Sequence, residues 1–190
     1  MRLTKVFTIV ILFFISFNTY SQISKEVDKY LGDTYTTNNN PKAKGLNFIV
    51  REPLGFYRDK TNFPNVIESW VKELNEIDVL SIVIEVSYMN DEIKKLSKSE
   101  LKKQVEILVN NNSVDSEFII NGYPGFLKKE EVEMERLNYE FILYNLTSTT
   151  FVNNYVLNIS LICSDKKTFE ENMLLFNLFA NSIVFTDQYN

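Results

Sequence analysis

Three glutamates alternate along one short stretch of the sequence, and their spacing could place carboxylates around a metal ion. Glu131, Glu133 and Glu135 lie two residues apart, so a β-strand would direct all three side chains to one face. Carboxylate oxygens are the ligands that Ca²⁺ prefers. Neighbours on one strand face lie about 7 Å apart, and one strand alone does not complete a coordination shell. We therefore expect a solvated face that blunts edge pairing, with no metal or other cofactor.

The residues needed for most catalytic mechanisms are missing. Histidine is absent, which excludes Ser-His-Asp and Cys-His catalysis and histidine-ligated zinc. The single cysteine, Cys163, ends an alternating apolar run, so we expect a buried and inert thiol. Hydrolysis that uses only carboxylates needs two acids facing one cleft, and no motif marks such a pair among the 25 acidic residues. We assign no catalytic residue.

The stretch REPLGFYRDK, residues 51–60, offers a binding surface instead. Arg51 and Arg58 bracket Phe56 and Tyr57 within it. Arginine and aromatic side chains are enriched where proteins contact one another. The alternative is a solvated loop whose aromatic side chains fold underneath.

A second candidate contact is Tyr123, in the stretch EFIINGYPGFLKK. Pro124 fixes φ near −65° and Gly125 tolerates a positive φ, so these residues predict a type I or II turn. The turn could be only a corner between two strands. It could also hold Tyr123 at a rigid tip, where ordering it for a partner would cost little entropy.

The N-terminal sequence, MRLTKVFTIVILFFISFNTYSQ, predicts a secretory signal peptide. A positive start precedes an apolar run too short to span a bilayer, and small residues precede a cleavage point between Ser21 and Gln22. We expect an exported protein, periplasmic or secreted, without a stable membrane anchor after cleavage. The net charge of −5 and the lack of a basic cluster indicate that nucleic acid is not a partner.

Secondary-structure patterns then divide the rest of the chain. We expect residues 22–44 to form a short helix followed by a polar linker. Residues 45–187 are expected to form a single domain. Alternation predicts strands at 46–53 and 79–89, whereas residues 65–74 fit either a helix or a strand. A helix is predicted after Ser97, which has capping-box spacing to Glu100. A meander of strands follows, and the chain ends with a helix and a short strand over residues 165–185.

This order of elements resembles the PsbP-like superfamily. The resemblance rests on REPLGF closing the first strand, FPNVIESW, LSIVIEV, INGYPG after the long helix, and the final FANSIVF. It implies an α+β fold in which helices flank an antiparallel sheet as an α/β/α sandwich. It also implies a non-enzymatic binding or accessory module, here of the bacterial cell envelope, with a protein partner of unknown identity. The alternatives left open are a carboxylate-dependent hydrolase and a structural subunit of an envelope assembly.

Overall fold

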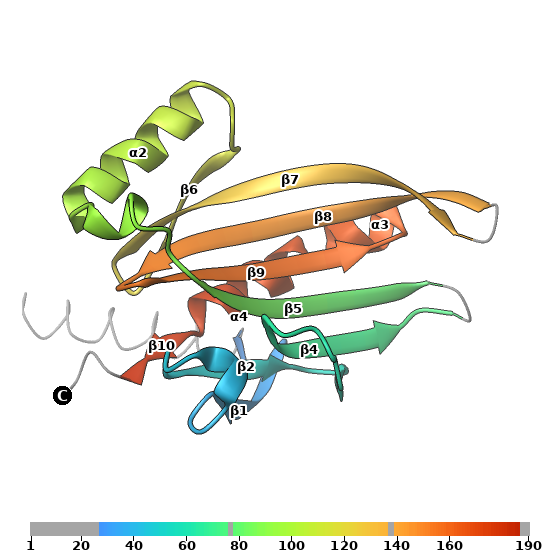
Figure 1. The fold of residues 1–190 in the computed structure, drawn as a ribbon. Helices are drawn as coiled ribbons and strands as arrows, with labels where there is room; N and C mark the ends of the chain where they lie inside the picture. The colour runs from blue at the N-terminus through green and yellow to red at the C-terminus, as the bar shows by residue number, and fades with distance from the viewer. Residues whose placement is uncertain (1–26, 76–77, 137–138, 187–190) are drawn as a thin grey trace, which may run out of the picture.

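The computed structural model describes residues 27–75, 78–136 and 139–186. Its centre is a seven-stranded antiparallel sheet in the order β3-β4-β5-β9-β8-β7-β6 (Figure 1). The strands of this sheet are β3 (Tyr57–Asp59), β4 (Val66–Glu73), β5 (Val79–Tyr88), β6 (Ser116–Ile120), β7 (Tyr123–Arg136), β8 (Tyr139–Val152) and β9 (Tyr155–Cys163). The predicted meander is confirmed by the consecutive pairing of β6, β7, β8 and β9.

A second, three-stranded sheet has the order β1-β2-β10. Its strands are β1 (Leu31–Thr36), β2 (Phe48–Pro53) and β10 (Val184–Phe185). The expectation of a linker up to residue 44 is wrong for this part, because β1 pairs with β2 and a 3-10 turn, η1 (Pro41–Ala43), follows. Leu31 and Tyr35 are buried, which anchors this polar stretch to the fold. The predicted helix before it lies largely outside the described residues.

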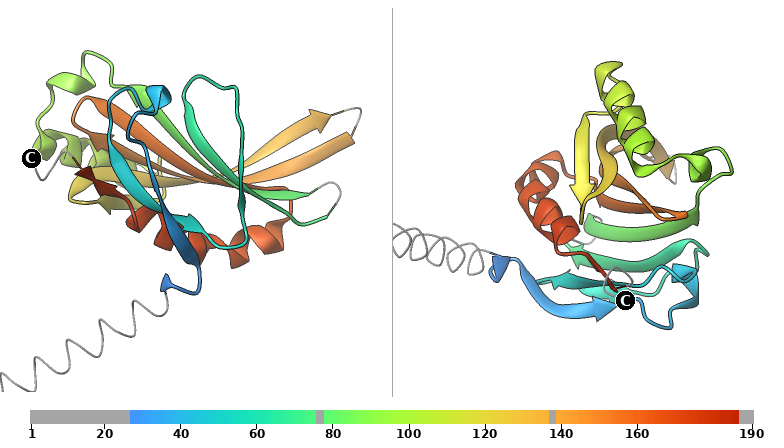
Figure 2. Two further views of the ribbon diagram at one scale, coloured as in Figure 1. Left: turned by 90° about the horizontal axis from the view of Figure 1, so that it is seen from below. Right: turned by 90° about the vertical axis from the view of Figure 1, so that its left-hand side faces the viewer.

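Helices lie on both faces of the large sheet, which confirms the expected α+β class (Figure 2). The 3-10 turn η2 (Ile93–Lys95) leads into α2 (Lys98–Asn110), which covers β6 and β7 on one face. On the other face, α3 (Lys166–Glu171) contacts β9 and α4 (Met173–Asn181) contacts β2 and β9. No helix among the described residues combines the length and the apolar character needed to cross a membrane.

Side-chain caps fix the starts of two helices. Ser97 and Glu100 form the predicted capping box at the start of α2. The C-terminal helix α3 begins at Lys166 and is capped by Asp165, whose carboxylate accepts a hydrogen bond from the Thr168 N–H. A break at Asn172 separates α3 from α4.

The core lies between one face of the large sheet, the small sheet and α3–α4. Alternate residues of β5 and β9 form its floor and are fully buried, as their periodicity predicts. Cys163 is the last of them and is buried, as expected. Burial also raises the pKa of its thiol, which keeps it protonated at neutral pH.

The predicted turn at Pro124 and Gly125 is wrong. The hairpin turn is formed by Asn121 and Gly122, with φ of 50° and 75°, and Ile120 pairs with Tyr123 across it. Positive φ at both central residues matches a type I′ turn, which Asn-Gly favours. Pro124 and Gly125 lie inside β7, and Gly125 is needed for close approach to β8 instead of for a positive φ.

Candidate functional site

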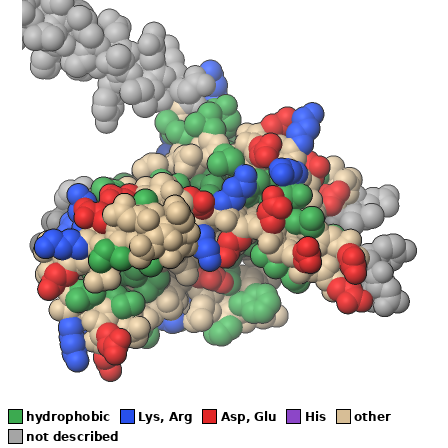
Figure 3. All heavy atoms as spheres, turned by 90° about the horizontal axis from the view of Figure 1, so that it is seen from above, with side chains coloured by type: hydrophobic (Ala, Val, Ile, Leu, Met, Phe, Trp, Pro, Cys, Tyr) green, Lys and Arg blue, Asp and Glu red, His purple; other side chains and the backbone are tan. Residues whose placement is uncertain are grey.

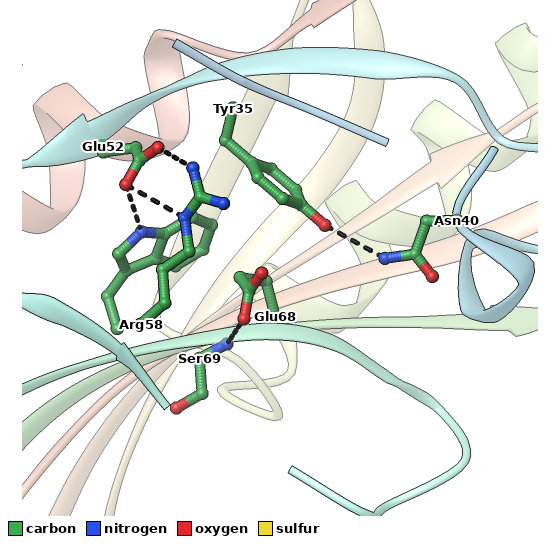
Figure 4. Close-up of polar contacts among 7 residues, drawn as sticks. Tyr35, Asn40, Glu52, Arg58, Glu68 and Ser69 are labelled. Atoms are coloured by element: carbon green, nitrogen blue, oxygen red, sulfur yellow. Dashed lines mark hydrogen bonds and ion pairs between the residues drawn. The ribbon is translucent and has the colours of Figure 1, made fainter. Parts of the chain in front are cut away.

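Polar side chains from β1, β2, β3 and β4 meet where the small sheet adjoins the edge of the large one (Figure 4). Arg58 on β3 donates from Nε to Oε2 of Glu52 on β2 at 3.2 Å, and its Nη2 pairs with Oε1 of the same carboxylate. Trp70, which lies opposite Arg58 in the β3–β4 register, donates from Nε1 to Glu52 Oε2 at 3.2 Å. Both carboxylate oxygens of Glu52 are thus engaged by a fork-like arginine contact and an indole N–H.

Aromatic rings fix the position of the Arg58 guanidinium. It lies over the Tyr35 ring, 4.9 Å from the centroid, and Tyr35 in turn meets the Trp70 ring edge-on at 5.4 Å. The Tyr35 hydroxyl accepts a hydrogen bond from Asn40 Nδ2 at 3.0 Å. One face of the Arg58 guanidinium therefore packs on the Tyr35 ring, while 48% of the arginine side chain stays exposed.

The two carboxylates at this site have pKa values shifted in opposite directions. The hydrogen bond from Arg58 lowers the pKa of Glu52, and burial opposes that effect only in part. Burial raises the pKa of Glu68, and the hydrogen bond that its carboxylate accepts from the Ser69 backbone N–H at 3.3 Å offsets this only in part. Burial likewise raises the pKa of Tyr35.

This arrangement suits recognition better than catalysis. Glu52 is occupied by its donors, so it is not free to act as a general base. Arg58 keeps its Nη1 group without a hydrogen bond among the described residues, on an exposed side chain. A held guanidinium with a free N–H can donate to a carbonyl or carboxylate of another molecule.

The five residues proposed from sequence do not come together. Phe56, Tyr57 and Arg58 share the edge segment that includes β3, where Phe56 packs partly against the core and Tyr57 is 49% exposed. Tyr57 donates its hydroxyl hydrogen to Glu73 at 3.0 Å.

Arg51 and Tyr123 make internal contacts. Arg51 donates to the carbonyl oxygens of Gly32 at 3.1 Å and Leu31 at 2.6 Å, which ties β1 to β2. Tyr123 lies near the opposite edge of the large sheet, where its ring meets Phe185 edge-on at 5.4 Å. It is therefore part of the packing and not the tip of a turn.

Sequence reasoning missed Tyr35, Asn40, Glu52 and Glu68. Trp70, their neighbour on β4, is fully buried. The available signal was an acidic residue, Glu52, at the end of the predicted strand 46–53, six positions before Arg58 in the segment that follows. Spacing alone could not show that the pair closes over a tyrosine from a segment expected to be a linker.

The opposite pKa shifts predict opposite effects of pH on two neutral variants. Glu52 contributes stability that is present above the ordinary glutamate pKa and is lost as pH falls through its lowered pKa. Glu52→Gln should therefore destabilise by about 1–2 kcal/mol at pH 7, with the difference shrinking in acid. Glu68 favours the folded state only when protonated, and that contribution is lost as pH rises through its raised pKa. Glu68→Gln should stabilise modestly at pH 7 and lose this advantage below the ordinary pKa.

Urea unfolding followed by circular dichroism between pH 3 and 8 measures both effects. Wild-type protein is the reference at each pH, so general acid effects cancel. If the change in unfolding free energy relative to wild type varied with pH in the same way for both variants, the opposite pKa shifts assigned to Glu52 and Glu68 would be contradicted.

Comparison with known proteins finds similarity of structure only. No protein-family model and no curated protein matches the sequence. A solved structure from Bacteroides thetaiotaomicron has a TM-score of 0.49 and 10% identity and covers 75% of this chain. The chain spans 46% of the length of that protein.

Two other solved structures cover most of both chains. A cyanobacterial PsbP from Synechocystis has a TM-score of 0.40 and 10% identity, and covers 80% of this chain and 91% of its own. LpqN, described as involved in cell envelope biogenesis of Mycobacterium tuberculosis, has a TM-score of 0.47 and 9% identity, and covers 81% of this chain and 91% of its own. A PsbP is thus among the structures similar to this chain, as the sequence resemblance predicts.

Proposed function

We propose that this chain is an exported, non-enzymatic binding or accessory module of a bacterial cell envelope. Its contact surface is the edge segment of residues 54–63, with Phe56, Tyr57 and Arg58 at its centre. The sequence pattern of residues 1–21, which is typical of a secretory signal peptide, supports export. Because the contacts of Arg51 and Tyr123 are internal, we do not include them in this surface.

The observation that carries the proposal is the exposure of apolar side chains around Arg58. Leu54 and Tyr57 are each 49% exposed, and Phe63 is 72% exposed. All three belong to the same edge segment, which leads from β2 through β3 towards β4. Burying such side chains against a partner contributes about 25 cal/mol for each Å² of apolar surface removed from water.

Arg58 would add a directional hydrogen bond to this apolar contact. Its guanidinium is already held by Glu52 and by the face of Tyr35, so binding would immobilise little further. A partner that supplies a carboxylate or carbonyl group would meet the free Nη1 donor. Aromatic residues and arginine together are the usual anchors of protein interfaces.

A hydrolase is the weaker alternative at this place. Two carboxylates with divergent pKa values can divide acid and base roles between them. Glu68, whose pKa is raised, would serve as the acid, and Glu52 would have to serve as the base. The donors that lower the pKa of Glu52 also occupy its oxygens, so the structure favours binding.

Removing the exposed aromatic side chains should abolish partner capture without unfolding the protein. We expect the double variant Tyr57→Ala/Phe63→Ala to retain less than about a tenth of the partner that wild-type protein captures from solubilised cell envelope, because anchor residues contribute about 2 kcal/mol each. Quantitative mass spectrometry of the captured proteins measures the ratio.

Tyr88→Ala is the matched control. Tyr88 is also an exposed tyrosine, 62% accessible, but it lies at the end of β5 beside Tyr155. It should capture as wild type does, and both variants should melt close to the wild-type temperature. Equal capture by wild type and by a folded double variant would refute this surface.

A further inference from the structure

The β7–β8 hairpin extends beyond its neighbouring strands. Its two strands have 14 residues each, but β6 pairs with β7 only as far as Leu127, and β9 pairs with β8 only from Tyr144 onward. The remainder projects from the body as a two-stranded ribbon (Figures 1 and 2). A two-stranded ribbon is at best marginally stable in water on its own.

The two faces of this ribbon differ in chemistry. Val132 pairs with Leu143 and Met134 with Phe141, so apolar side chains share one face. Val132 and Met134 are 40% and 43% exposed. A hollow of about 460 Å³ lies at the far end, and its lining consists of Glu133, Met134, Glu135, Glu140, Phe141 and Ile142.

The opposite face carries negative charge that is largely uncompensated. Glu131, Glu133 and Glu135 point to it, as the alternation predicts, and Glu140 lies directly across from Glu135. Of these four glutamates, only Glu131 forms an ion pair within the described residues, with Lys166 Nζ at 3.5 Å. Acidic side chains gather at the end of the molecule towards which the hairpin projects (Figure 3).

The backbone on the outer side of β7 is also unpaired in this region. At its start, Leu127 accepts a hydrogen bond from the Asp115 N–H, and the Lys129 N–H donates to the Asp115 carboxylate. Because outward-facing backbone groups recur at every second residue, those of Glu131, Glu133 and Glu135 face the same way. No strand within the described residues covers them.

We propose that this free edge of β7 binds an extended, basic segment of a partner protein by adding it as a further strand. Main-chain hydrogen bonds to Glu131, Glu133 and Glu135 would hold the segment. A segment in which Lys or Arg alternates with apolar residues fits best, since one face of the added strand meets the glutamates and the other meets Val132 and Met134. A second copy of this edge is a poor occupant, because glutamates would then oppose glutamates.

This surface is distinct from the edge segment of residues 54–63. β3 and β7 lie near opposite ends of the strand order. The inference therefore does not rest on the proposed function, and failure of one leaves the other standing.

A labelled heptapeptide of alternating lysine and valine is the probe, with its glutamate–valine counterpart as the control for charge. Fluorescence anisotropy with the whole protein should show binding of the basic peptide that weakens as salt rises, and no binding of the acidic one. Amide exchange read by NMR should slow at residues 131, 133 and 135 when the basic peptide is added.

Substitutions at Glu133 separate charge from strand addition. Glu133→Gln removes one charge and should weaken binding about two- to fivefold. Glu133→Pro also removes the outward N–H, and because that N–H is not part of the β7–β8 ladder the hairpin should persist. We expect this variant to bind at least about tenfold more weakly than wild type.

Glu92→Gln is the matched control, because Glu92 is an exposed acid at the start of η2, where it makes no side-chain cap, and it should bind as wild type does. Equal binding by wild type and Glu133→Pro, or unchanged exchange at the three amides, would overturn the proposal. Should the hairpin of Glu133→Pro unfold, the exchange result on wild-type protein still decides the question.

Discussion

Gly125→Ala should destabilise the protein by about 3 kcal/mol, although it adds only one methyl group. A Cβ at this position would lie 2.2 Å from the carbonyl oxygen of Thr149 and 2.9 Å from Cα of Thr150. Both obstacles are backbone atoms of β8, so neither can move without distorting the β7–β8 ladder. Overpacking of this kind costs about 1–3 kcal/mol and more where the backbone must shift.

Gly55→Ala is the control that separates steric overlap from backbone strain. Gly55 has a φ of +79°, but a Cβ there would meet no atom within 4 Å. Its substitution should cost only about 1–2 kcal/mol, the penalty for an L-residue in the left-handed region. Urea unfolding monitored by circular dichroism gives both values. A smaller loss for Gly125→Ala than for Gly55→Ala would show that β7 and β8 are not so closely spaced.

Two turn signals lie next to each other in the sequence, Asn121-Gly122 and Pro124-Gly125, and only the first forms the hairpin turn. Pro124 and Gly125 favour a turn by their local preferences, and that preference led to a wrong prediction. The Asn-Gly pair just before them is the stronger hairpin signal, because both residues tolerate positive φ. The role of Gly125 depends on the distance to another strand, which no local pattern contains.

Strands with regular alternation were predictable, and strands with bulges were not. β5 and β9 pair over nine residues without a shift in register, and their apolar periodicity is visible in the sequence. β4 has an irregularity between Val66 and Glu68, which leaves Val66 and Ile67 both buried and breaks the alternation. β1 has a similar shift between Leu31 and Thr34, so its few apolar residues show no period of two.

Only the residues of the candidate site that lie on and next to β3 were predictable from the sequence. Phe56, Tyr57 and Arg58 stood out because arginine and aromatic residues adjoin in the sequence. Their partners come from β1, β2 and β4, so the contact of Arg58 with Tyr35 and Glu52 depends on how the two sheets meet. Composition can nominate an exposed loop, whereas the residues that hold it in place are a property of the tertiary fold.

Trp70→Ala should be among the most damaging single substitutions, with a loss of about 3–5 kcal/mol. Trp70 is fully buried between two sheets and α4, and its ring meets Tyr35 at 5.4 Å and Phe179 at 5.2 Å, both edge-on. The variant would leave a large cavity at the centre of the core. Phe63→Ala, which removes an aromatic side chain that is 72% exposed, should change stability by less than about 0.5 kcal/mol.

Trp70→Phe isolates the polar part of the effect. Phenylalanine keeps most of the packing but cannot donate to Glu52 Oε2, so we expect a loss of about 1–2 kcal/mol. The hydrogen bond from Trp70 also lowers the pKa of Glu52, after the larger contribution of Arg58. Without it the pKa of Glu52 should rise, and the variant should begin to lose the stability contributed by Glu52 at a higher pH than wild type does.

A double-mutant cycle between Trp70→Phe and Glu52→Gln tests whether the two residues act together. If the indole donates to the carboxylate, the cost of Glu52→Gln should be smaller by about 0.5 kcal/mol or more once Trp70 has been replaced. Circular dichroism is the required signal, because Trp70 is the only tryptophan and its fluorescence disappears in the variant. Costs that add within about 0.3 kcal/mol would mean that Glu52 is held by Arg58 alone, and Trp70 would then position the arginine by packing and not through the shared carboxylate.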